Sequence, residues 1–242
     1  MELYLIRHGQ SSNNALAEDE ALRTPDAPLT DLGHEQARLL AGYLKDGRNR
    51  DPWYNPSTGA SRLEHEANWG ITHLYTSPMT RALQTSAPIA AALAIKPEVW
   101  VETHEHGGVY QQRPEGITGF PGLRRAEIET GFPGYLLPDR ITEQGWWNPA
   151  RGSETMPEAM ARAVQVSIDL RRRAESDERI LMVTHGTFLD ALIKALFAQL
   201  PSRTLFYLHY NTAITRIDFV ERERLLVRYL NRIAHLTVDK VS

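Results

Sequence analysis

Residues 3–11 of this 242-residue chain read Leu-Tyr-Leu-Ile-Arg-His-Gly-Gln-Ser, an apolar run followed at once by charged and polar residues. Its first four residues are apolar and are followed within three positions by a glycine, which is typical of a short buried strand. Arg7, His8 and Gly9 stand directly after those four residues. Because ligands in open α/β sheets bind just beyond the carboxyl ends of the strands, we expect a binding site here.

The chemistry of these three residues suggests that the ligand is a phosphoryl group. The guanidinium of Arg7 offers a planar set of donors to phosphate oxygens, and the imidazole of His8 can act as a nucleophile or a proton carrier. Gly9 lets the backbone come close to a ligand. Our hypothesis is that this stretch binds a phosphoryl group and attacks it.

Composition limits the partners of the protein. The formal net charge is −3 and the pI is about 6.3, so phosphate affinity has to come from locally clustered arginines. The chain has no cysteine, which excludes disulfides, thiolate catalysis and cysteine-bound metal. The N-terminus lacks the pattern of a signal peptide, and no apolar run approaches the roughly 20 residues that span a bilayer. We expect a soluble, cytoplasmic protein without nucleic-acid or membrane partners.

The rest of the chain alternates strand patterns with helix patterns. Strands are predicted at 72–76, 98–102 and 180–184, with a closing hairpin at 215–219 and 225–230. Helices are predicted after Thr30, after Ser77-Pro78, over 154–176 and over 188–200, and Pro88 is expected to kink or split the second one. This alternation predicts an α/β fold, a three-layer α/β/α sandwich with a mainly parallel sheet and an antiparallel edge.

Two segments without a clear period interrupt the pattern. We expect residues 1–242 to form a single domain that carries a polar insertion at about 46–70, with one helical turn at 62–68, and a lid at about 109–148. The aromatic residues of the lid favour packing over disorder, and the pair at 146–147 is expected to hold it down. Substrate specificity is expected in both segments. Arg124-Arg125 is either a solvated surface pair or a contact for an anionic substrate tail.

Four predicted strands each have a cationic or titratable group just past the carboxyl end. In chain order these groups are Arg7-His8, Ser77 with Arg81, His104-Glu105-His106, and His185-Gly186. In a parallel sheet the carboxyl ends of the strands share one edge, so these groups can meet in one cleft.

These residue types suit phosphoryl transfer, which requires positioned cations around the transferred group. Arg7 and Arg81 can each hold two phosphate oxygens, and His185 can donate to a third. His8 can attack phosphorus in line and form a phosphohistidine. Glu105 is the candidate acid that protonates the leaving oxygen and then accepts a proton from the attacking water. No metal or other cofactor is required if the arginines supply the charge.

Two alternatives remain at this stage. Glu102 is a second candidate for the acid; we prefer Glu105 because it lies beyond the predicted strand, beside two glycines, whereas Glu102 falls at the strand's end. His104 and His106 could also bind a metal together with the other two histidines of the cleft. No His-Glu-x-x-His pattern or acidic cluster accompanies them, so a metal site is disfavoured.

The segment from Leu5 to Asn14 resembles the Arg-His-Gly motif of the histidine phosphatase superfamily, also called the phosphoglycerate mutase-like family. Supporting matches are Leu29-Thr30, Gly33, Gln36-Ala37, Ser77-Pro78, Arg81-Ala82, Gln84-Thr85, Glu154-Thr155, Arg162, Val183–Gly186 and Asn211. The resemblance implies a phosphohistidine at His8 and an acid at the position of Glu105. The phosphate-binding residues expected from it are Arg7, His8, Asn14, Arg81, His185 and Gly186.

Three functions are compatible with this resemblance. They are a phosphatase that acts on a small phosphorylated metabolite, a mutase that moves phosphate between hydroxyls, and a non-catalytic phosphate-binding scaffold. Retention of both histidines and both arginines disfavours the scaffold. Mutases of the family typically have glutamate at the position of Gln10 and an Asn-Glu-Arg-His-Tyr-Gly-like segment where this chain has residues 103–110. We therefore expect a phosphatase, with the mutase second; the substrate stays open, and a homo-oligomer is possible.

Overall fold

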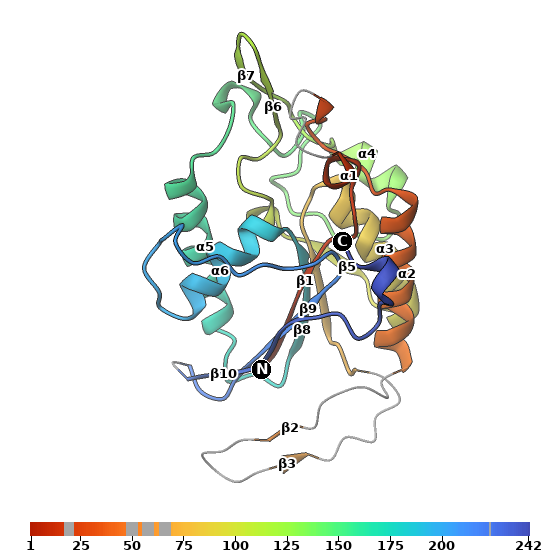
Figure 1. The fold of residues 1–242 in the computed structure, drawn as a ribbon, viewed down its shortest axis with the longest axis vertical. Coiled ribbons are helices and arrows are strands. Elements are labelled where there is room, and N and C mark those ends of the chain that lie inside the picture. Colours follow the sequence, from red (N-terminus) through yellow and green to blue (C-terminus); the bar gives the residue numbers. More distant parts are fainter. Residues whose placement is uncertain (17–21, 47–52, 55–60, 63–68, 223) are drawn as a thin grey trace.

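The computed structural model describes residues 1–16, 22–46, 53–54, 61–62, 69–222 and 224–242. Within these residues, six strands form one sheet in the order β10-β9-β1-β8-β4-β5 (Figure 1). Their bounds are β1 Glu2–Arg7, β4 His73–Thr76, β5 Pro97–Val99, β8 Arg179–Thr184, β9 Ile214–Phe219 and β10 Leu225–Arg232. The strands β1, β8, β4 and β5 run parallel, and β9 and β10 add an antiparallel edge. The mainly parallel sheet and the closing hairpin are therefore confirmed.

Helices cover both faces of this sheet (Figure 1). Leu3 and Leu5 of β1 pack against α5 (Met156–Arg171) and α6 (Gly186–Leu196), whereas Tyr4 and Ile6 pack against α2 (Asp31–Asp46) and α3 (Thr80–Leu93). Successive side chains of a strand point to opposite faces, which explains why the whole apolar run is buried. The predicted three-layer sandwich is confirmed.

Several helix boundaries differ from the sequence prediction. Thr30 caps α2 as expected, because its hydroxyl accepts the Gly33 N–H at 3.1 Å. The helix α3 begins at Thr80 and not directly at Pro78, as the Ser77-Pro78 pair had predicted. It continues unbroken through Pro88. Ser77 thus lies in the connection between β4 and α3, where its hydroxyl is available to other groups.

The longest predicted helix and the third strand are also shorter than expected. The helix α5 spans Met156–Arg171, whereas the sequence predicted a helix over 154–176. The strand β5 ends at Val99 and a 3-10 turn, η2 (Val101–Thr103), follows it. Glu102 therefore lies in a turn and not at the end of a strand.

The predicted lid has regular structure of its own. It contains a hairpin of β6 (Tyr110–Arg113) and β7 (Gly116–Gly119), followed by α4 (Arg125–Gly131). Trp146 and Trp147 are buried in an apolar cluster that joins the lid to α3 and β5, as expected. Arg125 donates to the carbonyls of Pro138 and Ile141, so it holds the lid together and is not simply solvated.

The predicted insertion at 46–70 lies away from the candidate cleft in its described part. Two short antiparallel strands, β2 (Trp53–Tyr54) and β3 (Ser61–Arg62), lie at the end of the molecule where β1 begins (Figure 1). The hairpin β6–β7 lies at the opposite end. The two described strands thus lie at the far end of the molecule from the lid hairpin, and a role of the insertion in specificity stays a prediction. The helical turn expected at 62–68 falls, apart from Arg62, outside the described residues.

In the described part of the chain, none of the helices is both long enough and apolar enough to cross a bilayer.

Candidate active site

The carboxyl ends of β1, β4 and β8 bring the predicted residues into one place. Arg7 is the last residue of β1 and His8 follows it, Arg81 lies in the first turn of α3, and His185 directly follows β8. His8, Arg81 and His185 are 3%, 8% and 0% exposed, and the rings of the two histidines lie 5.0 Å apart. The predicted meeting of these side chains at one edge of the sheet is observed.

Two hydrogen bonds show which ring nitrogen of His8 carries the proton. Its Nδ1 lies 2.6 Å from the Gly9 carbonyl oxygen, which can only accept, so Nδ1 carries the proton. The remaining nitrogen, Nε2, has a free electron pair and accepts the Arg81 Nε–H at 3.1 Å. Burial holds the pKa of His8 well below its usual value, and the charges of Arg81 and Arg7 lower it further. His8 is therefore neutral, with its unprotonated nitrogen directed at a cation.

The backbone around His8 is fixed from several sides. The side chain of Asn211 donates to the His8 carbonyl at 2.8 Å, and the Gly9 N–H donates to Thr85 at 3.0 Å. A Cβ atom on Gly9 would lie 2.5 Å from the carbonyl oxygen of Gly33, so no side chain fits there. Glycine is thus required at this position for the close approach of α2, a reason that the sequence did not show.

His185 presents a buried nitrogen without a partner. Its Nε2 lies 2.7 Å from the Ser77 hydroxyl, which can donate its proton to that nitrogen. Nδ1 then carries the ring proton, and it is buried with no hydrogen-bond partner among the described residues. Burial holds the pKa of His185 well below its usual value, with further lowering by Arg81 and His8. A neutral imidazole with an unused N–H is a donor ready for an anion.

The two arginines form a cationic pair beside these histidines. Arg7 donates from Nη1 to the His209 carbonyl at 2.7 Å, while its buried Nε has no partner in the described structure. Burial lowers the pKa of both guanidinium groups, although the negative charge of Glu105 opposes the shift in each. Arg81 also lies 3.8 Å from Asp26, whose carboxylate accepts the backbone and hydroxyl protons of Thr80. An anion of phosphate size would satisfy the unused donors of this pair.

Glu105 binds the start of α6 through its carboxylate. Its carboxylate accepts the backbone N–H groups of His106, Thr187 and Phe188 at 2.9, 3.2 and 2.9 Å. Together with Arg81, it lines a cavity of about 250 Å³ beneath the lid hairpin. The first turn of a helix stabilises a carboxylate, so the local backbone determines where this side chain sits.

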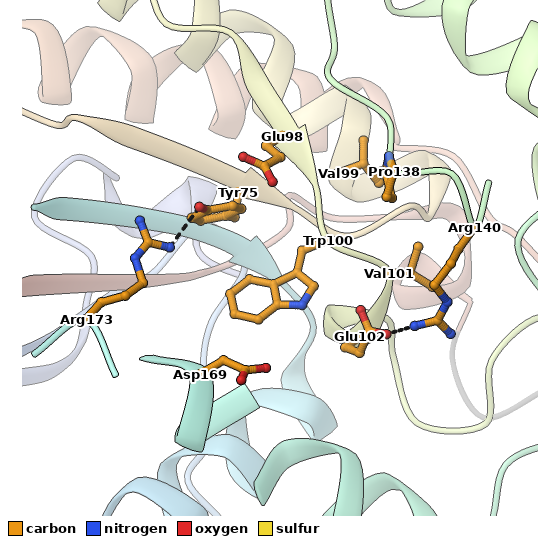
Figure 2. A pocket seen from close by; sticks show the side chains of 10 residues that line it. All are labelled: Tyr75, Glu98, Val99, Trp100, Val101, Glu102, Pro138, Arg140, Asp169 and Arg173. Atoms are coloured by element: carbon orange, nitrogen blue, oxygen red, sulfur yellow. Dashed lines mark hydrogen bonds and ion pairs between the residues drawn. The ribbon is translucent and has the colours of Figure 1, made fainter. Parts of the chain in front are cut away.

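Glu102, the second candidate acid, faces a different cavity. It forms an ion pair with Arg140 and lines a cavity of about 360 Å³ around Trp100 (Figure 2). Glu105 is absent from that lining. The structure therefore separates the two acids and leaves Glu105 as the one beside Arg81.

The other predicted phosphate-binding residues take different places. Gly186 is the first residue of α6, and a Cβ on it would lie 3.4 Å from Arg7 Nε. Asn14 is exposed at the end of α1 (Ser12–Ala15), and its side-chain oxygen accepts from Ser11 and Asn211. Gly186 thus adjoins the arginine pair, whereas Asn14 reaches the site through Asn211.

His104 does not join the other histidines as a ligand set would require. It is buried against Trp146 and Trp147, with its Nδ1 2.6 Å from the Val101 carbonyl oxygen. Within the described residues, no group of three or more His, Cys, Asp or Glu side chains could hold a metal ion.

The comparison with known families agrees with this geometry. The sequence model of the histidine phosphatase superfamily (branch 1) matches residues 3–56 and 59–232. The chain belongs to the histidine phosphatase superfamily. The fold class and the resemblance inferred from the sequence are thereby confirmed.

Proteins similar to this histidine phosphatase superfamily member are described as mutases in some cases and as phosphatases in others. A Yersinia enterocolitica protein described as probable phosphoglycerate mutase GpmB is 25% identical over 223 residues, which cover 91% of this chain and 86% of that protein. The phosphoserine phosphatase of Entamoeba histolytica, solved with 3-phosphoglyceric acid, superposes with a TM-score of 0.59 at 20% identity, covering 98% of this chain and 99% of that one. A mycobacterial glucosyl-3-phosphoglycerate phosphatase gives 0.58 at 20% identity over 96% and 99%. At these identities the solved structures support the fold.

Sequence reasoning missed several residues of this superfamily member's site. Ser77 was named among the groups of the cleft, but its pairing with His185 was not expected. Asp26 was not singled out, because an acid in a polar loop carries no local signal of its contact with Arg81. Glu154 and Arg162 were noted only as family matches, and their contacts to the Glu105 segment depend on tertiary packing.

Proposed function

We propose that this protein is a phosphoric monoester hydrolase that works through a phosphohistidine at His8. The observation that carries the proposal is the state of His8: it is buried and neutral, and its unprotonated Nε2 is directed at Arg81. Two buried donors without partners in the described structure, Arg7 Nε and His185 Nδ1, lie in the same cluster. A nucleophile surrounded by unused cationic and neutral donors suits a phosphoryl group.

In the first step His8 Nε2 attacks phosphorus and the bond from phosphorus to the leaving oxygen breaks. For this step Glu105 has to bind a proton first; it gives that proton to the leaving oxygen, so the alcohol departs neutral. Arg7, Arg81 and His185 donate to the three equatorial oxygens, where negative charge is spread in the transition state. These side chains supply the charge stabilisation themselves, so we expect activity without a metal ion.

In the second step water attacks the phosphohistidine from the side that the alcohol has left. The Glu105 carboxylate accepts a proton from this water, the bond from phosphorus to Nε2 breaks, and inorganic phosphate is released. His8 regains its free electron pair and Glu105 its proton, which closes the cycle.

The substrate that fits is a small and polar phosphate monoester. Arg23, His106, Tyr110, Gln111 and Gln112 line the cavity that begins at Arg81 and Glu105, and its volume of about 250 Å³ suits a small metabolite. Since the net charge of −3 gives no general attraction to nucleic acid or anionic membranes, we propose a free cytoplasmic metabolite as the partner.

A mutase is the second candidate, because several curated relatives at 25% identity are described as probable phosphoglycerate mutases. The two functions differ in the fate of the phosphoryl group. Incubation with 3-phosphoglycerate distinguishes them: a phosphatase releases phosphate, whereas a mutase forms the isomer without release.

The proposed hydrolysis is tested by phosphate release from a panel of phosphorylated metabolites and from p-nitrophenyl phosphate. His8→Ala is expected to abolish turnover of every substrate while its melting temperature stays near that of the wild type. Retained turnover in a folded His8→Ala variant would overturn the proposal. A panel that yields isomers and no phosphate would favour the mutase.

A further inference from the structure

The segment that carries Glu105 is held by an arginine from another part of the fold. Arg162 of α5 donates from the single nitrogen Nη1 to the carbonyl oxygens of Glu102 and His104, at 2.6 and 2.9 Å. These carbonyls stand on the N-terminal side of Glu105, one of them on the adjacent residue. One guanidinium therefore fixes the direction of the backbone as it enters Glu105.

Arg162 is itself fixed by a buried carboxylate. Glu154 accepts the Nε–H and the Nη2–H of Arg162 at 2.9 and 2.6 Å in a bidentate pair, and its side chain is only 2% exposed. The backbone N–H of Glu154 also donates to the Gly107 carbonyl at 3.0 Å. The Glu154–Arg162 pair thus contacts the segment on both sides of Glu105.

The pair also contacts the helix that receives the Glu105 carboxylate. The Arg162 guanidinium lies over the ring of Phe188, 4.6 Å from its centroid, and the Phe188 N–H donates to Glu105 Oε1 at 2.9 Å. The same guanidinium therefore sets the backbone before Glu105 and touches the residue that anchors its carboxylate. All of these contacts lead to one side chain.

We propose that the Glu154–Arg162 pair is a positioning device that sets the Glu105 carboxyl at hydrogen-bonding distance from the leaving oxygen. The inference rests on the proposed function, in which Glu105 is the proton donor. A general acid acts only within about 2.6–3.2 Å of its target, and a misplacement of about 1 Å can cost roughly 100-fold in rate. Neither residue of the pair touches the substrate; both act through Glu105.

The test compares two substrates whose leaving groups differ in their need for a proton. The glycerol of glycerol 2-phosphate leaves as a strongly basic alkoxide unless its oxygen is protonated. The p-nitrophenolate of p-nitrophenyl phosphate leaves with little help from an acid. Arg162→Lys keeps the charge beside Glu154 but offers no planar fork to span the carboxylate and two carbonyls. We expect kcat to fall roughly 10–100-fold on glycerol 2-phosphate and by less than about threefold on p-nitrophenyl phosphate.

A double variant separates positioning from a general loss of structure. If Arg162 acts through Glu105, Arg162→Lys combined with Glu105→Gln loses no more on glycerol 2-phosphate than Glu105→Gln alone, within about twofold. Arg173→Lys is the matched control, because Arg173 also pairs with a glutamate. Its Nε lies 2.7 Å from Oε2 of Glu178, and this pair is not the one that holds the Glu105 segment. The kcat of Arg173→Lys is expected to stay within about twofold of the wild type on both substrates.

Equal losses of Arg162→Lys on both substrates, or losses that multiply in the double variant, would overturn the inference. If Arg162→Lys does not fold, Glu154→Gln is judged by the same criteria, since it keeps the side-chain shape and removes the charge. A Glu105→Gln variant without leaving-group selectivity would instead refute the proposed proton donor itself. The two failures are therefore distinguishable.

Discussion

Among the single residues of the candidate site, Arg7 and His185 each have a buried side-chain nitrogen that could bind a ligand. Arg7 Nε and His185 Nδ1 have no hydrogen-bond partner within the described chain, although a buried polar group left unpaired costs about 1–3 kcal/mol. Such a cost is tolerated where function requires it, and an anion that accepts from both nitrogens removes it. If Arg7 and His185 act as proposed, the two nitrogens that meet the phosphoryl group are the ones without a protein partner among the described residues.

Arg23 supplies the most direct prediction about substrate choice. It is exposed at the mouth of the cavity, and its carbonyl accepts from the side chain of Gln111 at 3.2 Å, so lid and loop meet there. Arg23→Gln is expected to raise KM about tenfold for substrates with a second anionic group, the effect of losing a charge-assisted contact. The value for p-nitrophenyl phosphate, which has no second anion, stays unchanged. An equal rise for both substrates would show that Arg23 does not select the substrate.

Single residues could be predicted from the sequence where the topology alone brings them together. Arg7, Arg81 and His185 follow strands that share one edge, so their meeting followed from the alternation of strands and helices. The contact of Asp26 with Arg81 and that of Ser77 with His185 could not be predicted, because each depends on where a connection folds. Local spacing carries no information on such contacts.

At the scale of elements, the lid depends on close packing between glycine and tryptophan. Gly108 has a φ of +73°, and a Cβ on it would lie 2.5 Å from the Trp147 ring. Gly108→Ala is expected to displace the lid, with a strain of about 1–3 kcal/mol from the backbone conformation and a further cost from the contact. We expect a lower kcat/KM on metabolites and an altered tryptophan emission.

A matched glycine controls for the backbone conformation alone. Gly134 has a φ of +89°, and no atom lies within 4 Å of a Cβ placed there. Gly134→Ala is expected to lower stability by the strain only, with tryptophan emission and kcat/KM close to those of the wild type. If both variants change the emission equally, the contact with Trp147 is not what seats the lid.

Elements were predictable where propensity and burial agree. The apolar run of β1 and the hairpin of β9 and β10 match the structure, because a continuous or alternating apolar pattern directly reports burial. The start of α3 was wrong because Ser77-Pro78 has the composition of a cap, yet the chain extends for two more residues before the helix. The hairpin and the helix of the lid were not predicted, because the glycines and prolines of that segment interrupt the periodic pattern.

At the scale of the whole molecule, buried neutral histidines make stability depend on pH. Burial holds the pKa values of His8, His104 and His185 well below 6.5, their usual value. Below pH 6.5 these histidines bind protons in the unfolded chain but stay neutral in the folded chain. The free energy of unfolding therefore falls as the pH falls. Each histidine adds up to about 1.4 kcal/mol per pH unit to the slope of the free energy of unfolding against pH below pH 6.5. Well above pH 6.5 it adds nothing to that slope.

Urea unfolding at a series of pH values measures this dependence. His104→Gln removes one of the three groups without touching the proposed nucleophile, so the slope below pH 6.5 is expected to decrease relative to the wild type. An unchanged slope in His104→Gln, or a wild-type stability that rises as the pH falls from 6.5, would contradict the neutral state of these buried rings.

If the phosphoryl group passes through His8, a phosphorylated enzyme can be trapped and the label located on that residue. We expect Glu105→Gln to slow the attack of water but not the departure of p-nitrophenolate. A p-nitrophenyl phosphate radiolabelled in its phosphoryl group should then leave the label on the protein. We predict an acid-labile, alkali-stable label on the peptide that contains His8, and none in Glu105→Gln combined with His8→Ala. Turnover without any trapped label, or a label on another residue, would contradict the account.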